Sequence, residues 1–202
     1  MKNKKSLVAL VALLVVGVVG STFAYFTTTK TFKNEFKTEG YSTSVSETFE
    51  SPTEWTPGTT TEKVVTATNN GDVEVAVRVK LEEAWSNGLA LTQTTNDGTW
   101  NVAEINFANA DKWELKDGYY YYKEELAKGE STLPLFTGVT YNEKMTAELA
   151  GIVCTETTNG NTVTETCTSG NGYAGATYTL NVTVETIQAD AATTEWNYTP
   201  AK

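Results

Sequence analysis

Histidine is absent from all 202 residues of the chain. This absence removes the Ser-His-Asp triad, the Cys-His dyad and the His-Glu-x-x-His zinc site, because each of them needs an imidazole. Catalysis by carboxylates alone is chemically feasible, but no two acidic residues have a spacing that indicates a paired acid and base. We therefore expect a protein that is not an enzyme and that uses no cofactor and no metal.

Basic residues are also scarce, since 15 Lys and Arg stand against 25 Asp and Glu, for a formal net charge of −10. A surface this acidic repels phosphates and anionic lipids, so nucleic acid is not an expected partner. The length suits one domain with a sizeable core. No Pro-, Gly- or Ser-rich linker divides the chain.

Long apolar runs are missing except near the N-terminus. Three lysines precede an apolar run over residues 7–19, and a segment of small residues ends at Ala24. This order is typical of a cleavable secretory signal over residues 1–24, with cleavage between Ala24 and Tyr25. The alternative is an uncleaved anchor, because residues 7–24 are nearly long enough to span a bilayer. We expect a secreted protein of the extracellular matrix or cell surface, at the membrane only before cleavage.

Only two cysteines are present, Cys154 and Cys167, and the Thr-rich segment between them carries a hairpin-turn signal at Asn159-Gly160-Asn161. With Gly160 and Asn161 as the loop, the cysteines lie directly opposite each other on an antiparallel ladder, within reach of a disulfide. With Asn159 and Gly160 as the loop, each misses its partner by one residue. The expected export favours the disulfide. Two thiols without histidine make an incomplete metal site.

Strand patterns dominate the rest of the chain. Residues 73–81 and 176–185 alternate apolar and polar side chains, which predicts strands with one buried and one wet face. Weaker strand patterns cover residues 41–49, 62–68, 112–115, 119–122 and 144–153, whereas residues 102–110 and 123–128 favour short helical turns. Many short strands separated by Gly- and Asn-rich turns predict an all-β fold, an antiparallel sandwich or jelly roll with little helix.

The segment directly after Ala24 is rich in β-forming residues rather than linker residues, so cleavage would free an N-terminus that can itself pair as a strand. In a regular strand, one face of this segment carries Phe26, Thr28, Lys30, Phe32, Asn34 and Phe36.

Three sequence features resemble one known family. The signal ending at Ala24 and followed by Tyr25 is similar to those cut by the dedicated signal peptidase of Gram-positive biofilm-matrix operons. The order Pro57-Gly58, Asn69-Asn70-Gly71 and the strand of residues 73–81 resembles the core of the TasA/camelysin family. Residues 178–189 resemble the last core strand of its BsaA branch.

The resemblance implies a jelly-roll domain over residues 41–202, preceded by a donor strand and linker over residues 25–40. In the family, the segment freed by cleavage completes the sheet of the neighbouring copy, and the copies form an extracellular matrix fibre. The implied partners are the protein itself, in a head-to-tail homopolymer, and the dedicated signal peptidase, with room for an accessory matrix subunit. Phe26, Phe32 and Phe36 would then fill an acceptor groove. Alternatively, the segment completes its own sheet or is a disordered leader.

A carbohydrate-binding sandwich is the alternative function. Tyr119–Tyr122 and the tryptophans Trp85, Trp100 and Trp113 could offer aromatic faces to a sugar. Because alternate residues of a strand point to opposite faces, however, we expect two of the four tyrosines in the core. Some family members are labelled metalloproteases, but the missing histidines argue against that activity here.

Overall fold

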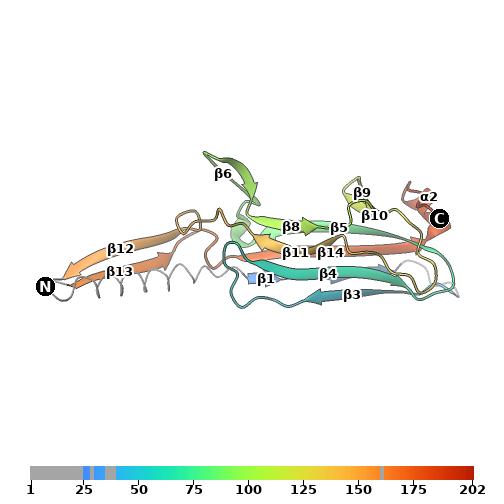
Figure 1. Ribbon diagram of the computed structural model, residues 1–202, viewed down its shortest axis with the longest axis horizontal. Coiled ribbons are helices and arrows are strands. Elements are labelled where there is room, and N and C mark those ends of the chain that lie inside the picture. The colour runs from blue at the N-terminus through green and yellow to red at the C-terminus, as the bar shows by residue number, and fades with distance from the viewer. Residues whose placement is uncertain (1–24, 28–29, 35–39, 160–161) are drawn as a thin grey trace.

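The computed structural model describes residues 25–27, 30–34, 40–159 and 162–202, and the side chains of residues 40–159 and 162–202. Two sheets of mainly antiparallel strands face each other in a sandwich, from which a long hairpin projects (Figure 1). The predicted all-β sandwich with little helix is confirmed. The expected signal peptide, including Ala24, lies outside the described residues.

The first sheet has the order β1-β14-β5-β10-β9, and β2 also pairs with β14. Its strands are β1 (Tyr25–Thr27), β2 (Lys30–Asn34), β5 (Val75–Trp85), β9 (Trp113–Lys116), β10 (Tyr119–Tyr122) and β14 (Thr177–Gln188). β5 and β14 form the longest ladder, from Tyr178 opposite Trp85 to Gln188 opposite Val75. These are the two strands that alternation predicts most clearly. Their inward residues are buried as expected, with Val77 and Leu180 at most 1% exposed.

The second sheet has the order β3-β4-β11-β8. Its strands are β3 (Thr43–Phe49), β4 (Thr60–Asn69), β8 (Ala103–Phe107) and β11 (Phe136–Tyr141). The helical turn expected over residues 102–110 is wrong, because this segment pairs with β11 as strand β8. The turn expected over residues 123–128 is also wrong. Leu126 forms an isolated bridge with Val75, and Glu124 forms one with Ala201.

Smaller elements surround the sandwich. They are the hairpin of β6 (Thr92–Thr95) and β7 (Gly98–Asn101), the short η1 (Ser86–Gly88), the projecting hairpin of β12 (Ile152–Asn159) and β13 (Thr162–Ser169), and α2 (Ala189–Glu195). The strand predicted over residues 144–153 is therefore mostly wrong. Turn hydrogen bonds precede β12, such as that from the Ala150 N–H to the Thr146 carbonyl (2.9 Å). Gly151 then takes a positive φ of 80°, which favours glycine.

Aromatic rings fill the centre of the sandwich. Trp55 lies 5.1 Å from Tyr141 between ring centroids, and Trp85 lies 5.2 Å from Tyr178. Trp85 is 4% exposed, and Trp100 and Trp113 are buried as well. Because a sugar would have to stack on an exposed ring face, these tryptophans do not form the platform that a carbohydrate-binding module needs.

The four consecutive tyrosines of β10 show how the C-terminus covers the outer face of the first sheet. Tyr122 points into the core, 5.0 Å from the Trp113 ring. Tyr121 points the other way but is also buried, because Tyr198 stacks on it at 4.3 Å. Tyr119 and Tyr120 are half-buried. Two tyrosines are buried as expected, but they are neighbours rather than alternate residues.

Candidate functional site

The outer edge of β14 is the place where the predicted donor segment lies. β1 and β2 run parallel to β14 in a single register, with Tyr25 opposite Thr177 at one end and Asn34 opposite Thr186 at the other. β5 occupies the other edge of β14. The backbone of residues 25–27 and 30–34 therefore completes the sheet of its own chain, which is the intrachain alternative considered for this segment. Donation to another copy stays a prediction.

The described positions of the predicted donor strand pair with buried positions of β14. Phe26, Lys30, Phe32 and Asn34 stand opposite Tyr178, Val182, Val184 and Thr186. All four of these β14 residues are buried. Thr28 and Phe36 lie outside the described residues. The backbone register therefore sets these four donor positions opposite inward-facing residues of β14.

The β14 edge is tied to the second sheet through Thr186. The Tyr41 hydroxyl lies 2.6 Å from Thr186 Oγ1, and Thr43 Oγ1 lies 3.0 Å from the same atom. Thr186 is 5% exposed. Burial raises the pKa of Tyr41, while its hydrogen bonds to Thr186 and Thr43 oppose that shift. These contacts hold β14 next to the start of β3, at one end of the ladder that β14 forms with β2.

A buried ion pair lies on the same side of the second sheet. Lys63 Nζ contacts Glu47 Oε1, joining β4 to the edge strand β3, and the two side chains are 0% and 6% exposed. Lys63 Nζ also lies 4.8 Å from the centroid of the Phe49 ring. Buried charges are costly to desolvate and need partners of opposite sign. The sequence alternation of β3 does not reveal this pair, because a Glu in a strand is normally placed on the wet face.

The projecting hairpin has the predicted register. Cys154 stands opposite Cys167 in the β12–β13 ladder, and Asn159 stands opposite Thr162. The two sulfur atoms form a disulfide, as predicted, with an S–S distance of 2.01 Å. Glu165 lies close to both sulfur atoms. Because the thiols are used in the disulfide, this group does not offer metal-binding thiolates.

Ionisable groups in the core have structural surroundings rather than reactive ones. Burial raises the pKa of Tyr178, and its hydroxyl donates a hydrogen bond to Glu83 Oε1 at 2.7 Å. Burial also raises the pKa of Tyr141. Both phenols therefore stay protonated at neutral pH and act as packed aromatic side chains.

The pairing of β1 and β2 with the outer edge of β14 is a feature that the sequence did not predict. The alternating pattern of residues 176–185 predicts a strand but not which side of it remains open. No pattern in the sequence marks this edge, because side-chain alternation distinguishes the two faces of a strand but not its two edges.

No helix among the described residues is both long enough and apolar enough to cross a bilayer. No protein-family model, no curated protein and no solved structure matches the chain. The assignment of function therefore depends on the chain's own geometry and chemistry.

Proposed function

We propose that this protein is the structural subunit of a secreted matrix fibre, in which residues 25–40 of one copy add to the β14 edge of the next copy. The observation that carries the proposal is the parallel pairing of β1 and β2 along the outer edge of β14. The segment lies at the end of the sheet and forms no hairpin with β14. It can therefore leave without disturbing the order of the other strands.

Strand addition makes this exchange physically reasonable. Without β1 and β2, the outer edge of β14 presents unpaired N–H and C=O groups, which an identical segment from another copy can pair with. Each copy would then give its segment to one neighbour and receive a segment from the other. Such a head-to-tail contact is heterologous and does not close on itself, so it produces filaments.

The donor segment and the domain that would accept it carry opposite charges. Residues 25–37 contain Lys30, Lys33 and Lys37 but only one acidic residue, Glu35. Residues 38–202 hold nine basic and 24 acidic residues. Two such domains repel each other, whereas the basic segment of one copy is attracted to the acidic domain of the next.

Electron microscopy of two purified proteins tests the proposal. Residues 25–202 should form filaments, and residues 38–202 should remain monomeric because they have no strand to donate. Monomers from both proteins under all assembly conditions would show that β1 and β2 serve only their own sheet, and would overturn the proposal.

Two single substitutions in residues 25–202 give a matched comparison. Phe32 stands opposite the buried Val184, whereas Lys33 stands opposite the half-buried Glu185. Phe32→Ser should prevent filaments, because the donated segment then lacks the apolar group opposite the buried Val184 of the acceptor. Lys33→Ser should lower the filament yield far less, because it removes one of three attracting charges and no apolar group. Equal filament yields from the two variants would contradict the assigned register.

A further inference from the structure

The side of the sandwich opposite the β14 edge is open. β8 is the last strand of the second sheet. In the first sheet, β10 pairs with β5 at Arg78 and Val79. Among the described residues, β5 from Leu81 onward therefore has a strand partner only in β14, and its other edge is free, as is the outer edge of β8.

A groove of about 540 Å³ lies between these two free edges, and apolar side chains form much of its lining. Leu81 comes from β5, Ile105 and Phe107 come from β8, and Leu115 and Tyr120 come from the β9–β10 hairpin. Phe107 is 51% exposed and Leu115 is 61% exposed. Two large apolar side chains thus meet in one groove while largely open to water, which is typical of a binding surface.

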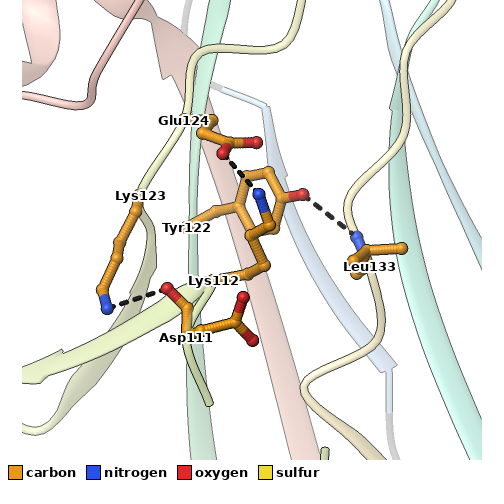
Figure 2. A network of polar contacts seen from close by, with 6 residues as sticks. All are labelled: Asp111, Lys112, Tyr122, Lys123, Glu124 and Leu133. Atoms are coloured by element: carbon orange, nitrogen blue, oxygen red, sulfur yellow. Dashed lines mark hydrogen bonds and ion pairs between the residues drawn. The ribbon is translucent and has the colours of Figure 1, made fainter. Parts of the chain in front are cut away.

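The groove has a preformed wall, because polar contacts brace the ends of β9 and β10 (Figure 2). Lys112 Nζ lies 2.6 Å from Glu124 Oε1, and Lys123 Nζ donates to the Asp111 carbonyl at 2.9 Å. On the groove side, the Tyr120 ring lies 5.4 Å from the Phe107 ring. The β9–β10 side of the groove is therefore already formed before a partner binds.

Backbone groups of β8 are available to a partner strand. The Val102 carbonyl accepts from the Asn142 N–H at 3.0 Å, and the Ala108 N–H donates to the Leu135 carbonyl at 2.8 Å. The Val102 N–H donates elsewhere, to the Leu91 carbonyl at 2.8 Å, but these two backbone groups are directed towards the β11 side. Successive residues of a strand direct them to opposite sides, so Ala103, Ile105 and Phe107 present theirs to the groove.

The charge of the groove defines the partner. Glu83 and Glu104 line it, and none of its lining residues is basic. We infer that the groove binds an extended segment of another protein, with large apolar side chains at alternate positions and Lys or Arg at its ends. The segment would pair with the β8 edge, and its cations would lie near the two carboxylates. This site is separate from the β14 edge and does not depend on polymerisation.

The probe for this site is a labelled, blocked peptide, Lys-Phe-Thr-Val-Thr-Phe-Lys, titrated into residues 25–202 that carry Phe32→Ser to prevent filaments. Fluorescence anisotropy should show saturable binding. Amide NMR shifts should concentrate on residues 81–83 and 103–107. No saturation up to about 1 mM peptide, or shifts centred on β14, would overturn the inference.

A double variant tests the contribution of the exposed apolar side chains to peptide binding. Phe107→Ser combined with Leu115→Ser should weaken the peptide about ten-fold, because it removes the exposed apolar lining. Val153→Ser, which changes a 58% exposed side chain on the projecting hairpin, should leave the affinity unchanged. Equal affinities for the two proteins would contradict the proposed site.

Charge is tested separately and with less risk to folding. Glu104→Gln should weaken the lysine peptide, and a peptide with Glu in place of both Lys should bind the unaltered groove about ten-fold more weakly. If neither Glu104→Gln nor the Glu-containing peptide changes the affinity, the chemistry proposed for the partner is wrong. If the peptide does not bind the groove but residues 25–202 still form filaments, only the inference about the groove is wrong, and the proposed fibre function is unaffected.

Discussion

The sandwich and the projecting hairpin are both built from antiparallel ladders, but different forces hold them. In β14, alternate side chains are buried, with Tyr178 and Leu180 at 0% exposure. In β12, every residue after Ile152 is exposed. The hairpin has instead the disulfide between Cys154 and Cys167. A two-stranded ladder is marginal in water without a buried face, so the covalent link supplies what the hairpin lacks in burial.

The largest effect should come from Asn69, which stabilises the sandwich from within. Asn69 is fully buried, its Nδ2 donates to the Val73 and Leu126 carbonyls at 2.7 and 2.8 Å, and its Oδ1 accepts from the Gly71 N–H at 2.9 Å. Asn69→Ala should lower the free energy of unfolding by about 3 kcal/mol, since three hydrogen bonds disappear and buried partners lose their contacts. Urea unfolding followed by fluorescence measures this change.

The neighbouring asparagine provides the control. Asn70 is exposed, and its Nδ2 donates to the exposed Ser44 Oγ at 2.8 Å. Asn70→Ala should lower the free energy of unfolding by less than about 1 kcal/mol, because water can replace the lost contact. Similar losses from the two variants would mean that burial does not distinguish these positions.

The disulfide should matter to the hairpin and little to the sandwich. In Cys154→Ser combined with Cys167→Ser, amide hydrogen exchange should become much faster across β12 and β13. The free energy of global unfolding should change by less than about 1 kcal/mol, because the exposed hairpin opens as a local unit. Hydrogen exchange read by mass spectrometry separates the two regions. Loss of protection in β5 and β14 as well would show that the regions are coupled.

The smallest effect concerns Glu125, where the sandwich carries a local electrostatic penalty. Burial and the nearby Glu74 carboxylate raise the pKa of Glu125. The folded state therefore binds this proton more tightly than the unfolded state does. The ionised carboxylate destabilises the fold above the folded-state pKa, and the penalty fades as the pH falls through that pKa. Glu125→Gln should raise Tm at pH 7 by on the order of 1 °C.

At pH 4 the Tm difference between Glu125→Gln and the unchanged protein should be smaller than at pH 7, because a carboxyl with a raised pKa is ionised to a smaller extent there. Glu124→Gln is the control at the adjacent position. Glu124 accepts an ion-pair contact from Lys112 Nζ at 2.6 Å, so its loss should not stabilise the protein. A Tm gain at pH 7 from Glu124→Gln, or none from Glu125→Gln, would contradict this assignment of the penalty.

Sequence reasoning succeeded where the relevant contacts are local or periodic. The hairpin register follows from one turn, so placing Gly160 and Asn161 in the loop is enough to pair Cys154 with Cys167. Alternation likewise predicts β5 and β14. Where pairing is distant, the prediction failed: within residues 102–110, expected as a helical turn, Ala103–Phe107 forms strand β8 by pairing with β11. The burial of Tyr121 depends on Tyr198, which is 77 residues away along the chain.

The all-β class, the two long strands, the hairpin and its disulfide could be predicted from sequence alone, because side-chain periodicity and turn residues act over a few neighbouring positions. Which strand lies at each edge depends on the tertiary structure: residues 25–27 and 30–34 pair along β14, whereas part of β5 and the outer side of β8 have no neighbouring strand among the described residues and border a groove. An edge is open or closed according to which distant strand lies beside it. That choice depends on the packing of the whole sandwich, so no local pattern in the chain encodes it.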